Sequence, residues 1–159
     1  MFFLKINWKK LLLFIAIPLL VGGLSALLTS DSMQNFASLN KPPLSPPAWL
    51  FPVVWTVLFI LMGIASYIVW EKSTGVQRRN ALTLYFIQLF FNFFWSVIFF
   101  NLEAYLFAFV WLVILWLLIA VTAYLFYRIN KTAGYLMLPY LLWVTFAGYL
   151  NLSIYLLNP

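Results

Sequence analysis

Three uncharged polar side chains recur at every fourth position of one apolar stretch, and they are the first candidates for chemistry in this chain: Gln88, Asn92 and Ser96. Residues four apart share one face of an α-helix, and Trp95 lies beside that face. Amides and hydroxyls in apolar surroundings need hydrogen-bond partners, so this face is expected to point inward. Gln88 and Ser96 fit helix-to-helix contacts and a pocket wall equally well, whereas the neighbouring tryptophan favours a pocket for Asn92.

Two other apolar stretches carry a similar stripe that includes a tryptophan, the first with the same four-residue step and the second with steps of three or four residues. They contain Pro139, Trp143, Ala147 and Asn151 in one case, and Trp55, Phe59, Met62 and Ser66 in the other. Flat aromatic walls with a few convergent polar groups suit a large, planar, mostly apolar ligand. The alternative is that these residues only pack helices together. Because a tryptophan shares the face of Asn151, we favour the pocket for this residue.

The ionisable residues exclude several classes of site. The chain has no cysteine and no histidine, so disulfides, thiolate chemistry and the commonest metal ligand are absent. Asp31, Glu71 and Glu103 are the only acids, and none lies in the middle of an apolar stretch. Proton-coupled transporters usually carry ionisable groups at membrane depth. We therefore expect no metal site, no acid–base hydrolysis and no obligatory cofactor, and a proton-coupled transporter is disfavoured.

The elements that position these residues must lie in lipid. Of 159 residues, 66% are hydrophobic and only 8% are charged, against roughly 45–50% and 25% in soluble domains. The net charge of +6 is spread over short clusters between apolar runs. This pattern is typical of membrane-protein loops rather than of a nucleic-acid-binding surface, so lipid is an expected partner and nucleic acid is not.

The sequence predicts an all-α membrane protein, a bundle of five transmembrane helices forming one domain over residues 1–159. A spanning helix needs about 20 mostly apolar residues, and five stretches qualify: 11–28, 51–70, 81–100, 105–127 and 135–157. The first is longer than the apolar core of a signal peptide, so we expect a retained helix rather than a cleaved leader. Pro18 is expected to bend it.

The basic residues predict the orientation of the bundle. If the five helices alternate in direction, one side of the membrane carries eight basic residues, and the other side carries only Lys41. The eight are Lys5, Lys9, Lys10, Lys72, Arg78, Arg79, Arg128 and Lys131. Basic loops lie in the cytoplasm of membrane proteins. We expect an integral protein of the cell membrane with a cytoplasmic N-terminus and an outer C-terminus.

The long connector at 29–50 is expected to form an ordered lid on the outer side. Five of the eight prolines fall between Pro42 and Pro52. The segment KPPLSPP favours polyproline II, which loses little conformational entropy on ordering. Loops of this length in compact domains are usually functional or disordered, and we expect a functional one.

Three segments of the chain resemble the TspO/translocator protein family, the tryptophan-rich sensory proteins, and in particular its bacterial members. They are ASLNKPP with PPAW and the following FP, VWT, MG and YIVW, then QLxxNxxWSxxFF from Gln88 to Phe100, and PYLLWVTFAGYLNLSIYLLN from Pro139 to Asn158. The resemblance covers nearly the whole chain and also implies five helices with a long first connector.

The resemblance implies a receptor that binds protoporphyrin IX-type tetrapyrroles. Benzodiazepine- and isoquinoline-carboxamide-like planar ligands would use the same cavity beneath the first connector. The implied lining residues are Pro42, Pro43, Trp55, Asn92, Trp95, Trp143, Ala147, Leu150 and Asn151, with Ser25, Phe36 and Phe59 as weaker members. The resemblance also implies a homodimer as a possible assembly, although no GxxxG motif marks an interface. Phe36 stands where relatives often carry tyrosine, and no basic residue follows Tyr155 as it does in cholesterol-binding relatives, so sterol binding is not expected.

Several alternatives remain open at this point. The protein could instead be a passive transporter of porphyrins, or a structural bundle that acts through partner proteins. Light-dependent degradation of protoporphyrin IX, reported for some bacterial members, would assign a chemical role to Trp55 and Trp143. Lys41, the only basic residue on the lid side, fits both a partner of a ligand carboxylate and an ordinary loop cation.

Overall fold

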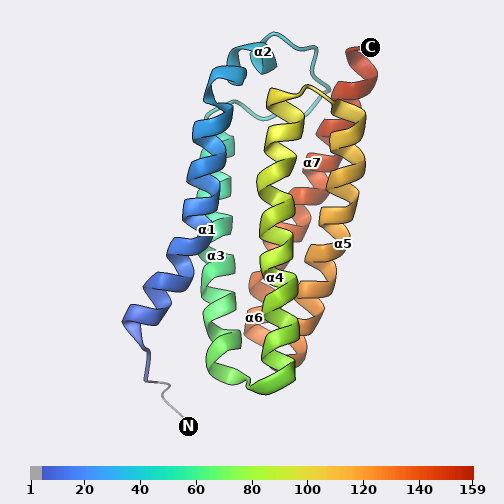
Figure 1. The fold of residues 1–159 in the computed structure, drawn as a ribbon. Coiled ribbons are helices and arrows are strands. Elements are labelled where there is room, and N and C mark those ends of the chain that lie inside the picture. Colours follow the sequence, from blue (N-terminus) through green and yellow to red (C-terminus); the bar gives the residue numbers. More distant parts are fainter. Residues whose placement is uncertain (1–4) are drawn as a thin grey trace.

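A computed structural model describes residues 5–159, and all regular structure in this range is helical. Five helical spans are long and apolar enough to cross a membrane, which confirms the predicted fold class. The spans run side by side as an upright bundle (Figure 1). The first four residues of the predicted domain lie outside the described range.

Five long helices form the bundle, and four short helical segments connect or extend them. The long helices are α1 (Trp8–Thr29), α3 (Leu50–Lys72), α4 (Gly75–Ser96), α5 (Tyr105–Ile129) and α7 (Leu138–Leu157). The short segments are η1 (Ser30–Ser32), α2 (Met33–Ala37), η2 (Val97–Asn101) and α6 (Lys131–Leu136). The lid therefore consists of η1, α2 and the irregular residues 38–49.

Two predicted boundaries differ from the structure. α3 continues through Lys72 and α4 already begins at Gly75, six residues before the predicted start at 81, so only Ser73 and Thr74 separate the two helices. The helix expected at 135–157 consists of α6 and α7, which meet at Met137. Met137 ends α6 by donating its amide hydrogen to the carbonyl of Gly134 at 3.1 Å, and Pro139 lies in the first turn of α7, where its missing amide hydrogen is tolerated.

Pro18 lies inside α1 without ending the helix. Its missing amide frees the carbonyl of Phe14 four residues earlier, and this oxygen faces Gly63 of α3. A Cβ atom at Gly63 would lie 2.9 Å from the Phe14 oxygen and 2.6 Å from the Cα of Ile15. The glycine thus lets the two backbones approach closely and places its Cα–H against the freed carbonyl.

The packing order of the helices leaves one gap near the lid. α1 packs on α3, α4 packs on α5, and α5 also packs on α6 and α7, while α3 packs on α6 but touches α7 very little. Residues from α1, α3, α4 and α7 consequently surround a space beneath the lid, and α5 supports α4 and α7 from outside (Figure 1).

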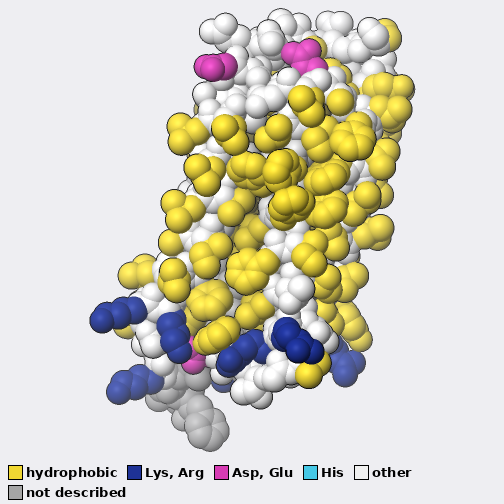
Figure 2. Space-filling model, viewed as in Figure 1, with side chains coloured by type: hydrophobic (Ala, Val, Ile, Leu, Met, Phe, Trp, Pro, Cys, Tyr) yellow, Lys and Arg dark blue, Asp and Glu magenta, His cyan; other side chains and the backbone are white. Residues whose placement is uncertain are grey.

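The two ends of the bundle differ in charge. On the face shown in Figure 2, Lys and Arg side chains gather at the end opposite the lid, and a broad hydrophobic belt separates them from the lid. The connection between α3 and α4, the start of α1 and the turn between α5 and α6 all lie at this basic end. The fold thereby brings together basic clusters that are far apart in the sequence.

Candidate functional site

A cavity of about 860 Å³ lies between α1, α3, α4, α7 and the lid. Its volume is within the usual range of about 300–1,000 Å³ for small-molecule sites. Ten of the residues proposed from the sequence line it: Ser25, Phe36, Trp55, Phe59, Asn92, Trp95, Trp143, Ala147, Leu150 and Asn151. The structure therefore brings to one space residues that the helical spacing indicated, such as Trp55, Asn92 and Trp143, together with residues that only the family resemblance implied: Ser25, Phe36 and Leu150.

Pro42 and Pro43 are not among the cavity-lining residues in the described part of the chain. The carbonyl of Pro42 accepts a hydrogen bond from the Ser45 hydroxyl at 2.9 Å, and that of Pro43 accepts one from the Tyr149 hydroxyl at 2.8 Å. These prolines brace the lid, and Pro46 and Pro52 contribute to the wall in their place. The expectation that Pro42 and Pro43 form the wall is not met because their carbonyls anchor the turn.

One wall of the cavity is built from aromatic side chains of α3 and α7. Trp55 stacks on Phe59 with ring centroids 5.5 Å apart and an interplanar angle of 27°. Trp143 stands edge-on to Trp55, at 6.5 Å and 88°. The indole Nε1 of Trp143 is buried and has no hydrogen-bond partner within residues 5–159. This wall therefore offers flat apolar faces, while the Trp143 nitrogen itself is enclosed by protein atoms.

The opposite wall is held rigidly by Trp95 and Asn151. Trp95 stacks on Phe99 at 5.2 Å, and its indole Nε1 donates to the Asn151 Oδ1 atom at 3.0 Å. The Asn151 amide in turn donates to the backbone carbonyl of Tyr105 at 2.8 Å. These bonds satisfy the polar atoms of both side chains, so Trp95 and Asn151 shape the wall more than they supply free hydrogen-bonding groups.

Asn92 is held by a residue that the sequence patterns did not reveal. Its amide donates to the Tyr140 hydroxyl at 2.7 Å, and that hydroxyl donates to the Oε1 atom of Gln88 at 2.6 Å. Gln88 is fully buried outside the cavity wall, so it joins helices, whereas Ser96 lines the cavity. A buried amide needs a partner, and this requirement could have directed attention to Tyr140, which lies one turn from Trp143.

The end of α4 winds more widely than predicted. The segment expected as α-helix up to residue 100 becomes the π-turn η2, in which the Leu102 amide donates to the Val97 carbonyl at 3.1 Å. Phe99 and Phe100 in this turn both line the cavity. Single π-turns within α-helices occur frequently at functional sites, and this one lies where the lid meets the bundle.

The lid is tied to the bundle at both of its sides. The backbone amide of Asn40 donates to Oδ1 of Asn158 at 3.0 Å, and the side-chain amide of Asn158 donates to the backbone carbonyl of Asn40 at 2.9 Å. On the other side Ser32 donates to Asn101 at 2.6 Å. The lid therefore lies over the cavity in a defined position even though much of it has no regular secondary structure.

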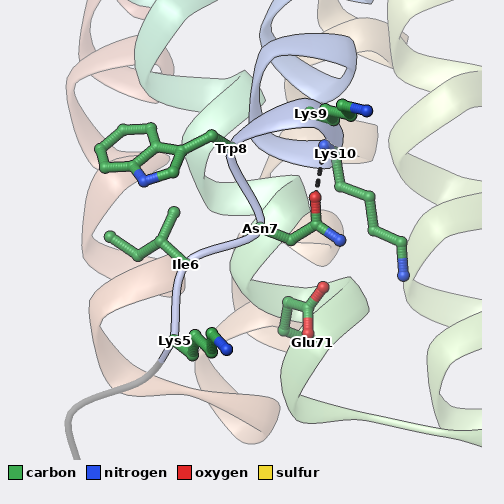
Figure 3. A pocket seen from close by; sticks show the side chains of 7 residues that line it. All are labelled: Lys5, Ile6, Asn7, Trp8, Lys9, Lys10 and Glu71. Atoms are coloured by element: carbon green, nitrogen blue, oxygen red, sulfur yellow. Dashed lines mark hydrogen bonds between the residues drawn. The ribbon is translucent and has the colours of Figure 1, made fainter.

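A second hollow, of about 490 Å³, lies at the basic end of the bundle. It is lined by Lys5, Ile6, Asn7, Trp8, Lys9, Lys10 and Glu71 (Figure 3). Asn7 caps the first turn of α1 by accepting a hydrogen bond from the Lys10 amide at 3.2 Å. The side chains around this hollow are mostly charged or polar, so it lacks the flat aromatic walls that distinguish the cavity beneath the lid.

Comparison with known proteins identifies the family of the chain. A sequence model of the TspO/MBR family matches residues 14–157. The tryptophan-rich protein TspO of Chlorobaculum tepidum is 44% identical over 128 residues, which cover 78% of this chain and 79% of that protein. The tryptophan-rich protein TspO of Archaeoglobus fulgidus is 40% identical over 153 residues, with coverage of 96% and 99%. The translocator protein of Bos taurus is 35% identical over 147 residues, with coverage of 91% and 87%. The chain is therefore an integral membrane protein that belongs to the TspO/MBR family.

Proposed function

We propose that this protein is a membrane receptor for planar aromatic molecules of the tetrapyrrole class, with protoporphyrin IX as the ligand to test first. The cavity beneath the lid carries the proposal because it combines sufficient volume with aromatic walls and few polar groups. Benzodiazepine- and isoquinoline-carboxamide-like compounds would occupy the same space. No residue of the wall is a histidine, so a metal-free porphyrin suits the site better than an iron porphyrin.

The geometry of the aromatic wall supports this class of ligand. The indole faces of Trp55 and Trp143 meet almost at right angles, so a flat ring system can stack on one of them while its edge meets the other.

The packing on the basic side of the cavity favours a receptor over a passive transporter. Beyond Phe59 and Asn92 the bundle interior is filled by fully buried side chains, which include Met62, Tyr85 and Tyr140. A molecule as large as a porphyrin could cross only if these side chains moved apart. In the membrane we place the lid on the outer side of the cell membrane and the N-terminus in the cytoplasm, in agreement with the basic end of the bundle.

Titration of the purified protein with protoporphyrin IX, followed through the absorbance of the porphyrin, tests the proposal. We expect saturable binding, and we expect Trp143→Ala to weaken it by about 10- to 100-fold because an aromatic stacking face of the cavity wall is lost. Trp116→Ala is the matched control: Trp116 lies on α5, outside the cavity wall, and donates to Thr145 at 2.7 Å. The affinity of the Trp116→Ala variant for protoporphyrin IX should stay within about twofold of wild type. Equal affinities for the two variants would refute the location of the site.

A flux assay in liposomes separates the receptor from the passive transporter. Porphyrin loaded inside vesicles that contain the protein should leak out no faster than from protein-free vesicles. Fully buried side chains close the basic half of the bundle and leave no path for the porphyrin. Efflux that rises in proportion to the amount of reconstituted protein would instead establish transport.

Removal of the Asn158 contact is expected to loosen the lid. In Asn158→Ala the hydrogen bonds to the amide and carbonyl of Asn40 are lost, at about 1 kcal/mol each. The bound porphyrin should therefore dissociate about 5- to 30-fold faster, with a smaller change in the association rate. Stopped-flow displacement measures this rate. Asn130→Ala, which removes a cap from α6 at the opposite end, is the control, and equal dissociation rates in the two variants would contradict a role for the lid.

A further inference from the structure

The hollow at the basic end of the bundle carries an excess of positive charge that the proposed function does not use. Among the described residues, its lining contains Lys5, Lys9 and Lys10 but only one acid, Glu71. All four side chains are exposed, and three positive charges against one negative charge leave an excess of two. In Figure 3 the ring of Trp8 points to the opposite side of the segment from the ammonium group of Lys10. The start of α1 therefore presents a charged side and an apolar side.

The segment that carries these lysines is fastened to α3. The backbone amide of Asn7 donates to the Tyr67 hydroxyl at 2.9 Å, and the side chain of Asn7 accepts from the Lys10 amide at 3.2 Å. Two turns later, the ring of Phe14 packs against the rings of Tyr67 and Trp70, with centroids 6.2 and 5.9 Å apart. These contacts fix the start of α1 against the end of α3, so the hollow between the two helices has a defined shape.

An exposed apolar face of α1 continues from the hollow toward the middle of the bundle. Trp8 is 64% exposed and Leu12, one turn later on the same face, is 63% exposed, while Leu13 follows Lys9 in the same way. Only 11% of the most apolar part of the span Trp8–Ala37 is buried, against 33–44% in the other four spans. This helix therefore offers lipid chains more surface than the other helices do, directly beside the lysines.

We propose that this hollow binds the phosphate group of an anionic phospholipid in the leaflet at the basic end, with the acyl chains of the lipid along the exposed face of α1. Lysine ammonium groups form charge-assisted hydrogen bonds with phosphate oxygens, and basic clusters beside a membrane attract anionic headgroups. Trp8 lies at the level of the headgroups, where tryptophan is enriched in membrane proteins. A soluble phosphate compound would gain the ionic contacts alone, whereas a lipid also covers the apolar face, and this continuity favours the lipid.

The experiment measures lipid binding by native mass spectrometry of the purified protein in detergent. The protein is titrated with dioleoyl phosphatidylglycerol, which has a net negative charge, and with dioleoyl phosphatidylcholine, which has the same chains and no net charge. Wild type should bind the anionic lipid about tenfold more tightly at low salt, and this preference should fall as salt screens the charges.

Two double variants locate the site. In Lys9→Gln/Lys10→Gln the dissociation constant for phosphatidylglycerol should rise about 10- to 30-fold, while that for phosphatidylcholine should change little. The matched control is Arg128→Gln/Lys131→Gln, which removes two charges from the turn between α5 and α6, outside the hollow. This control should keep the wild-type preference, and circular dichroism should show wild-type helicity in both variants because the substituted side chains are exposed or partly exposed.

A competition experiment separates a lipid from a soluble phosphate compound. Glycerol 3-phosphate has the phosphate group without acyl chains, so a large excess over the lipid should leave bound phosphatidylglycerol in place. Displacement at concentrations similar to that of the lipid would overturn the assignment to a lipid.

The remaining outcomes are equally decisive, and none depends on porphyrin binding. Equal affinities of wild type for the two lipids would refute the site. An equal loss of preference in the two double variants would assign the effect to the overall charge of the basic end and would also refute a site in the hollow. A loss confined to Lys9→Gln/Lys10→Gln supports the proposal.

Discussion

Substitution of Ala147 by phenylalanine is expected to reduce the affinity for protoporphyrin IX by at least about 100-fold, or about 2.7 kcal/mol. Ala147 lies on α7, one turn from both Trp143 and Asn151, and its small side chain lines the cavity. A benzyl group at this position would fill space that a planar ligand needs between the tryptophan walls. Titration with the porphyrin measures the effect directly.

The cavity also explains why this variant should still fold. Extra carbon atoms in a close-packed core cost about 1–3 kcal/mol because neighbouring side chains must move. At Ala147 an existing empty volume can receive the ring, so thermal unfolding in detergent should change little. Ala120→Phe on α5, whose residues do not line the cavity, adds the same group elsewhere and should leave porphyrin affinity unaltered. Normal binding by Ala147→Phe would show that the ligand does not occupy this cavity.

Gly63→Ala is expected to destabilise the bundle by about 2–3 kcal/mol, which is the largest stability effect we predict. The added Cβ would lie 2.6 Å from the Cα of Ile15 and 2.9 Å from the carbonyl oxygen of Phe14. Both are backbone atoms of α1, so no side-chain rotation can relieve the overlap. The two helices must separate, and the Phe14 carbonyl freed by Pro18 would lose its close neighbour. Thermal unfolding in detergent measures the loss.

Gly23→Ala provides the matched control for this prediction. It makes the same change in a helical glycine of α1, but a Cβ at Gly23 would meet no atom within 4 Å. Alanine has a higher helix propensity than glycine by about 1 kcal/mol, so Gly23→Ala should leave stability unchanged or raise it. The two alanine substitutions therefore have opposite expected signs. A similar loss of stability in both would show that helix propensity or detergent effects, and not the close approach of α1 and α3, determine the result.

Helical periodicity identified several central residues of the cavity wall on α3, α4 and α7. Asn92, Trp95, Trp143 and Asn151 were identified because polar and aromatic residues on one helical face must turn away from lipid, and all four line the cavity. Spacing could not show how their polar atoms are used. The indole nitrogen of Trp95 donates a hydrogen bond to the Asn151 side chain, whereas the indole nitrogen of Trp143 has no hydrogen-bond partner among the described residues. Such differences depend on distances between helices, which a pattern along one helix does not contain.

The irregular parts of the chain were harder to predict. The prolines at 42 and 43 indicated a stiff connector, but whether a given proline faces the cavity depends on how the loop turns. Here their carbonyls are bound by Ser45 and Tyr149, and Pro46 and Pro52 line the wall instead. The π-turn at Val97–Asn101 was also unpredicted, because its apolar residues are equally compatible with an α-helix.

The sequence by itself determined that this protein is a bundle of five membrane helices, because hydrophobic length and the requirement to satisfy backbone hydrogen bonds in lipid leave few alternatives. It also determined which helical faces turn inward. Only the tertiary structure decided which of these residues enclose the empty space and which of their polar atoms are already paired. Those properties depend on packing between segments far apart in the chain, where a shift of about one ångström makes or removes a hydrogen bond.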